Sequence, residues 1–172
     1  NIRKINEINI CLVGRKHPWK GFIDFLKPFN EGKIIGINNV YVLSHDDLSN
    51  FDLSKVTLVR PKNDEEIAYY MNISHIFICT SWWEGFGLPP LEAMACGCAV
   101  ILTNAGGVSE YAIPGKNCLM YEPRNQEQLI SCINMLVNNS QLRKKLSYEA
   151  IKTAKKFSWE KSAMQLLEAL KD

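Results

Sequence analysis

Two carboxylates stand eight residues apart in the stretch 81–97, with glycines and then two adjacent prolines between them. The apolar run 76–80 precedes this stretch and predicts a buried strand. Glycines after Glu84 allow a tight turn, and the prolines before Glu92 suit the first turn of a helix. A strand, a glycine turn and a helix in this order present free N–H groups and the positive end of a helix dipole. This arrangement predicts an anion site.

The two carboxylates have different places in this unit. Glu84 falls in the turn, whereas Glu92 falls inside the first turns of the helix. They therefore do not stack on one helical face. One can reach the mouth of the site while the other lines its wall.

Two cations flank an earlier turn, between the predicted strand 8–13 and the predicted helix 22–29. Arg15 ends the strand and Lys20 precedes the helix. A guanidinium and an ammonium at this position would neutralise a diphosphate. The alternative interpretation is two solvated charges near a loop.

The stretch from Glu84 to Glu92, within EGFGLPPLEAMACG, closely resembles the signature of retaining, GT-B-fold glycosyltransferases of the GT4 type (glycosyltransferase group 1). The resemblance implies that Arg15 and Lys20 hold the diphosphate of a nucleotide-sugar donor. It also implies that Glu84 binds a sugar hydroxyl beside the reacting carbon and that Glu92 binds the ribose hydroxyls. The expected catalytic residues are Glu84, Arg15 and Lys20. The expected donor-binding residues are Gly14, Arg15, Lys20, Arg60, Pro61, Glu84, Gly85, Phe86, Gly87, Leu88 and Glu92.

No metal and no cofactor are expected at this site. The chain has no Asp-x-Asp motif, and Arg15, Lys20 and a helix N-terminus can stabilise the departing diphosphate without an ion. The donor is expected to be a nucleotide diphosphate sugar, such as a UDP- or GDP-sugar.

Strands that alternate with helices, followed by helices alone, predict a Rossmann-like α/β fold, a doubly wound parallel sheet of about five or six strands with trailing C-terminal helices. The predicted strands are 8–13, 40–43, 56–59, 76–80, 99–102 and 118–121. Ligands of such sheets bind beyond the carboxyl ends of the strands. The glycine pair 106–107 also falls at one of these ends and resembles a second glycine loop bordering the donor pocket.

Single residues decide the details of the predicted helices and of the core. Pro28 should make the helix 22–29 short or kinked. The expected caps are Asn63 or Asp64 for the helix before the fourth strand, and Asn125, Ser140 and Ser158 for the three trailing helices. One of Trp82 and Trp83 can pack while the other faces the cleft, and no rule decides which. Four aromatic residues at helical spacings are assigned to the core: Tyr69, Tyr70, Phe157 and Trp159.

The 172 residues, 47% of them hydrophobic, are enough for one domain. The net charge of +2 and the absence of a long apolar run favour neither nucleic-acid binding nor a membrane span. Six cysteines without a Cys-x2-Cys pair indicate free thiols in a reducing cytoplasm; a metal or redox pair at Cys96 and Cys98 is the alternative.

The start at Asn1, without an initiator Met, suggests a piece of a longer protein. Residues 1–172 are interpreted as the donor-binding domain, inactive alone, and the resemblance implies an N-terminal acceptor-binding domain as its partner. The acceptor would be a glycan or a lipid-linked sugar in polysaccharide, lipopolysaccharide or glycolipid assembly. The expected location is the cytoplasm, with possible peripheral association at the inner face of the membrane through the other half.

Two other functions remain open from the sequence. A glycoside hydrolase could use Glu84 and Glu92 as acid and base, although it leaves Arg15 and Lys20 unexplained. A catalytically silent nucleotide-sugar sensor or scaffold would share the whole pattern. A dinucleotide-binding oxidoreductase is disfavoured because no Gly-x-Gly-x2-Gly follows the first strand.

Overall fold

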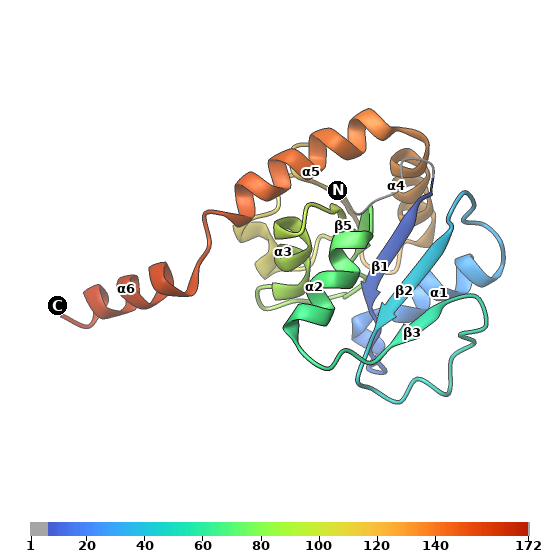
Figure 1. Ribbon diagram of the computed structural model, residues 1–172, viewed down its shortest axis with the longest axis horizontal. Coiled ribbons are helices and arrows are strands. Elements are labelled where there is room, and N and C mark those ends of the chain that lie inside the picture. The colour runs from blue at the N-terminus through green and yellow to red at the C-terminus, as the bar shows by residue number, and fades with distance from the viewer. Residues whose placement is uncertain (1–6, 172) are drawn as a thin grey trace.

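A sheet of six parallel strands organises the part of the chain that the structure, a computed structural model, describes, residues 7–171 (Figure 1). The strands are β1 (Asn9–Val13), β2 (Asn39–Leu43), β3 (Thr57–Val59), β4 (Ile76–Ile78), β5 (Ala99–Thr103) and β6 (Cys118–Tyr121). Their order in the sheet is β3-β2-β1-β4-β5-β6. The chain leaves β1 toward one edge and leaves β4 toward the other, so the carboxyl ends of β1 and β4 form a topological switch point, the place where sheets of this kind bind ligands in a crevice. The predicted α/β Rossmann-like fold is confirmed.

Helices cover both faces of the sheet. One face packs against α1 (Phe22–Asn30) and α4 (Gln126–Asn138), and the other against α2 (Asp64–Ile73), α3 (Leu88–Ala95) and α5 (Ser140–Ala154). Successive side chains of a strand point to opposite faces, and β1 follows this rule. Ile10 and Leu12 enter the core on the α1 side, while Cys11 enters the core on the α3 side.

Most predicted helix starts are confirmed by hydrogen bonds. The Asn63, Asn125 and Ser158 side chains accept from backbone N–H groups in the first turns of α2, α4 and α6 (Trp159–Ala169). The predicted cap Ser140 is wrong by one residue, because the Asn139 side chain accepts from the N–H of Leu142. Pro28 lies in the last turn of α1, which continues to Asn30, so the proline does not end the helix.

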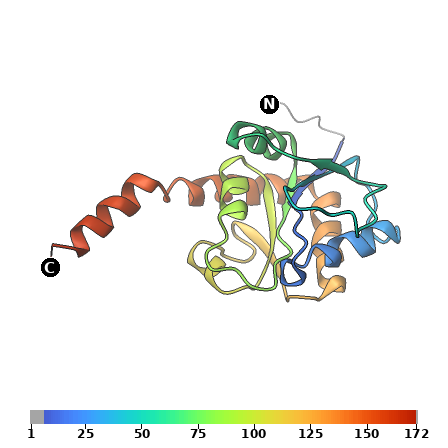
Figure 2. The same ribbon diagram turned by 90° about the horizontal axis from the view of Figure 1, so that it is seen from below.

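The last helix, α6, extends away from the rest of the molecule (Figures 1 and 2). It buries no residue, and Trp159 is 79% exposed. The assignment of Trp159 to the core is therefore wrong, as is that of Tyr69, which is 52% exposed. Phe157 is also exposed, yet its ring contacts the rings of Phe86 and Tyr111.

The six cysteines are free thiols, and five of them are buried. Burial raises the pKa of Cys118 to about 12, so this thiol stays protonated at neutral pH. Within residues 7–171, none of the helices has the length and apolar character needed to span a bilayer.

Candidate active site

The crevice at the switch point brings together two loops that lie far apart in the sequence. One follows β1 and contains the short 3-10 helix η1 (Pro18–Lys20); the other follows β4. The backbone N–H of Trp82 donates to the carbonyl oxygen of Trp19 at 2.7 Å, and the Thr80 hydroxyl donates to the carbonyl oxygen of Lys20 at 2.7 Å. These two bonds fix one loop against the other.

The result is an ion pair between Lys20 and Glu84. The Lys20 Nζ atom lies 2.7 Å from Glu84 Oε1, and the two side chains are 29% and 15% exposed. The backbone of Glu84 is held from the other side by the second glycine loop. Its N–H donates to Ala105, and its carbonyl accepts from the N–H of Gly107. A carboxylate and an ammonium thus lie in contact in the crevice and are partly shielded from water.

The glycine turn after Glu84 has the geometry that the sequence predicts. Gly87 has φ +81° and immediately precedes α3, whose first residue is Leu88, with the two prolines next. The Tyr111 hydroxyl donates to the Gly87 carbonyl at 2.7 Å, and the Phe86 ring packs against the Tyr111 ring. Burial raises the pKa of Tyr111 far above its ordinary value, which keeps this hydroxyl a donor. The Phe86 side chain therefore anchors the turn.

Arg15 lies on the β2 side of the crevice and has a carboxylate partner of its own. Its Nε donates to Asp46 Oδ2 at 3.1 Å, and the backbone N–H of Lys16 donates to the same oxygen at 2.9 Å. The Lys16 bond is the main reason that the pKa of Asp46 is lowered. Arg60 Nη1 donates to the carbonyl oxygens of His45 and Asp46 at 3.3 Å.

Two further expected residues shape the backbone here. Gly14 donates to the Leu43 carbonyl at 2.9 Å, and a Cβ at this position would lie 2.5 Å from a Val42 methyl group. Pro61 is buried next to Arg60. The sequence interpretation missed Asp46, which lies three residues after β2, because its bonds to Arg15 and Lys16 join segments about 30 positions apart in the sequence.

Glu92 is apart from the ion pair, one turn into α3. Partial burial of its carboxyl, together with the charge of Asp64 at the start of α2, raises the pKa of Glu92. The residue itself is exposed at the surface of α3. Within residues 7–171 no hydrogen bond or ion pair joins its side chain to Glu84, so the two carboxylates have separate environments.

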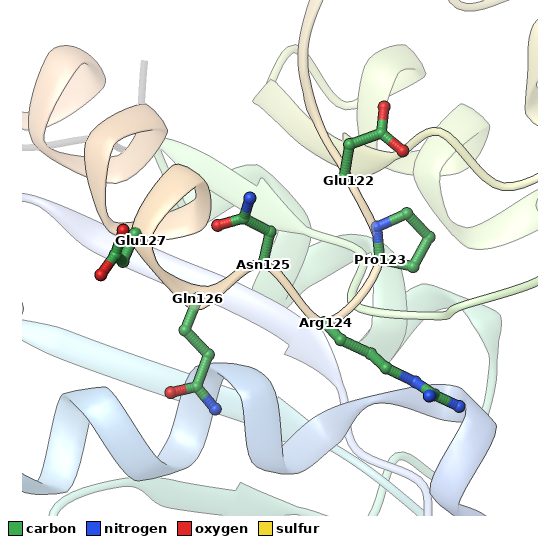
Figure 3. Close-up of a pocket in the computed structure, with 6 residues that line it drawn as sticks. All are labelled: Glu122, Pro123, Arg124, Asn125, Gln126 and Glu127. Atoms are coloured by element: carbon green, nitrogen blue, oxygen red, sulfur yellow. The ribbon is translucent and has the colours of Figure 1, made fainter.

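Arg124 is a second residue that the sequence interpretation missed. It lies in the loop between β6 and α4, beside a shallow hollow lined by residues 122–127 (Figure 3). It is the one non-glycine residue in the described range with a positive φ, +66°. Its guanidinium carbon stands 4.0 Å from the centre of the Trp82 ring, a cation–π contact. The signal was its place after the sixth strand, at the same edge of the sheet.

A family model described as "Glycosyl transferases group 1" matches residues 2–153. The chain belongs to the group 1 glycosyltransferase family. Among curated members, an uncharacterised glycosyltransferase from Methanocaldococcus jannaschii is 36% identical over 88% of this chain and 44% of its own length. The O-antigen chain mannosyltransferase B of Escherichia coli is 32% identical over 63% of this chain and 28% of its own length. This chain spans less than half the length of these glycosyltransferases.

Solved structures share this fold. The C-terminal domain of a group 1 glycosyl transferase from Francisella tularensis has a TM-score of 0.75 at 26% identity, covering 87% of this chain and 85% of that one. An Anabaena protein in complex with UDP-glucose has a TM-score of 0.84 at 20% identity, covering 96% of this chain and 49% of that one. The first similarity is to a whole domain, and the second to about half of a larger protein.

The two loops of the site pack closely at Gly21, so we expect a substitution there to destabilise the protein strongly. This residue has φ +61°, and a Cβ here would lie 2.0 Å from the Thr80 carbonyl oxygen. We expect Gly21→Ala to lower the free energy of unfolding by about 3 kcal/mol or more, since backbone strain and a backbone clash add. Gly115→Ala is the matched control: its φ is +74° with no atom within 4 Å, and it should cost about 1 kcal/mol. Urea denaturation measures both, and equal losses would contradict the close approach.

Proposed function

We propose that this chain is the donor-binding domain of a retaining glycosyltransferase of the GT4 type. It would bind a nucleotide diphosphate sugar and support transfer of a hexose or deoxyhexose to an acceptor glycan or lipid-linked sugar. The observation that carries the proposal is the Lys20–Glu84 ion pair at the switch point of a group 1 glycosyltransferase fold. Relatives that include a mannosyltransferase and a structure with UDP-glucose support the donor class.

In this proposal the diphosphate lies across the loop between Gly14 and Lys20, and Arg15 bonds to it. The N-terminus of α3 and the backbone of the glycine turn add N–H donors. The backbone at Arg60 and Pro61 contacts the nucleobase, and Glu92 accepts hydrogen bonds from the ribose hydroxyls. The cationic side chains stabilise the leaving diphosphate, so the step needs no metal ion.

Glu84 and Lys20 would act on opposite sides of the bond that breaks. In the structure Lys20 is paired with Glu84. When the donor binds, a sugar hydroxyl donates to Glu84, and the ammonium of Lys20 turns toward the phosphate. During transfer, positive charge develops at the sugar carbon beside the carboxylate, and negative charge develops on the diphosphate beside the ammonium. Both groups therefore stabilise the transition state more than the ground state.

The whole protein would contain a second, acceptor-binding domain, in keeping with relatives more than twice as long as the matched region. The exposed apolar side chains of α6 would pack against that domain, and the active site would lie in the cleft between the two. This domain alone would then bind donor without transferring sugar. We place the enzyme in the cytoplasm, associated with the inner face of the membrane through the second domain.

Arg15 provides the direct test of diphosphate binding. Arg15→Ala should weaken UDP binding by roughly 1.5–3 kcal/mol, the range of a charge-assisted hydrogen bond, and leave uridine binding nearly unchanged. Calorimetric titrations with EDTA present measure both ligands and test binding without metal. Lys33→Ala is the control for net charge, because Lys33 follows the C-terminus of α1 and pairs with Glu31. Equal losses for UDP and uridine would contradict the assignment; so would equal effects of the two variants.

Glu92 gives the proposal a pH dependence. Its ionised carboxylate accepts hydrogen bonds from the ribose in this proposal, and partial burial raises its pKa. Acidification from about pH 7 to about pH 5 should therefore weaken uridine binding, since more of the carboxyl becomes protonated than for an ordinary glutamate. Glu92→Gln should bind uridine more weakly at neutral pH and lose this pH dependence. An unchanged pH profile in the variant would show that Glu92 does not bind the ribose.

A further inference from the structure

Trp82 makes two hydrogen bonds in different directions. Its backbone N–H donates to the Trp19 carbonyl at 2.7 Å, within the loop that carries Lys20. Its indole Nε1–H donates to the carboxylate of Asp24 at 2.6 Å. Asp24 lies in the first turn of α1. Trp82 therefore connects the loop after β4 both to the loop after β1 and to α1.

The Asp24 carboxylate is well suited to hold an indole. It is 5% exposed, and a buried carboxylate is costly unless it receives hydrogen bonds. Its position in the first turn of α1 also places it at the positive end of the helix dipole. Breaking the contact would leave a buried charge without this donor, so the indole is held firmly in place.

Contacts cover one face of the Trp82 ring and its indole nitrogen, whereas the side chain of Trp83 is largely exposed. Arg124 stacks on the Trp82 ring at 4.0 Å, and the indole nitrogen approaches so closely that a Cβ on Gly21 would lie 2.9 Å from it. Trp83, the next residue, is 67% exposed. The structure thus decides between the two tryptophans: Trp82 packs and Trp83 faces solvent.

We propose that Trp82 is a positioning residue which, with Asp24, fixes the loops that carry Lys20 and Glu84, so that the two side chains lie at bonding distance and the Lys20 ammonium is placed for a diphosphate. Lys20 directly follows the residue that accepts from the Trp82 backbone, and Glu84 is two residues after Trp82. Trp82 itself touches neither side chain of the pair; it acts through the loops that carry them. The part that concerns diphosphate rests on the proposed function.

The first test needs no nucleotide. Urea denaturation of Lys20→Met, Glu84→Gln and the double variant gives the coupling between the two side chains. The same cycle is repeated in protein carrying Trp82→Phe, which keeps an aromatic ring beneath Arg124 but removes the indole N–H. The coupling should be lost in the Trp82→Phe series and retained in a Trp83→Phe series. Equal coupling in both series would overturn the proposal, whether or not the protein binds nucleotide.

The second test measures UDP and uridine binding by calorimetry. Trp82→Phe should weaken UDP binding about tenfold and leave uridine binding unchanged, while Trp83→Phe should alter neither. Asp24→Ala should weaken UDP binding as much as Trp82→Phe does. Asp24→Asn keeps an acceptor oxygen for the indole, so its UDP affinity should lie within about threefold of wild type. In a Lys20→Met background, Trp82→Phe should have no further effect on UDP.

The outcomes separate the two proposals. Parallel losses of UDP and uridine affinity in Trp82→Phe would mean a merely structural tryptophan and would overturn the inference. So would a full additional loss in the Lys20→Met background. If wild-type protein binds neither UDP nor other nucleotide diphosphates, the proposed function fails, and the urea cycle alone decides whether Trp82 positions the pair.

Discussion

The site depends on one contact, the 2.7 Å ion pair between Lys20 and Glu84, two residues that lie 64 positions apart in the sequence. Such a pair is favourable only where its geometry is fixed and water is partly excluded, because exposed pairs contribute little. The sheet supplies the fixed geometry. Since β1 and β4 are neighbours whose connections diverge, their two loops meet over the crevice instead of being covered by a crossover helix.

The rest of the site holds this contact in place from several sides. The second glycine loop bonds to the backbone of Glu84, and Tyr111 holds the turn that leads into α3. On the other side, Asp46 holds Arg15 away from the pair. The protein therefore holds Arg15 and Lys20 on separate carboxylates, and a bound diphosphate would have to draw both cations toward itself. This makes sugar and diphosphate binding interdependent in the proposed enzyme.

The fold could be predicted from the sequence because its signals are local. Short apolar runs, the glycine turn, and side-chain caps such as Asn125 depend on neighbours within a few residues. The residues that were missed depend on tertiary placement. Asp46 bonds across 31 positions and Asp24 across 58, and neither distance leaves a trace in the local pattern. Trp159 was assigned to the core because helical spacing indicates that a helix has an apolar side. The spacing does not indicate whether other parts of the chain pack against that side.

The central claim is that Glu84 binds the sugar while restraining Lys20, and the most direct measurement compares bare UDP with UDP-glucose in wild type and Glu84→Ala. The account predicts that the variant binds bare UDP nearly as tightly as wild type, because Glu84 contacts only the sugar and Trp82 still fixes the loop that carries Lys20. It also predicts that any preference for UDP-glucose over UDP falls about tenfold, the effect of losing a charged hydrogen bond. A loss of bare UDP affinity as large as the loss for UDP-glucose would contradict the account.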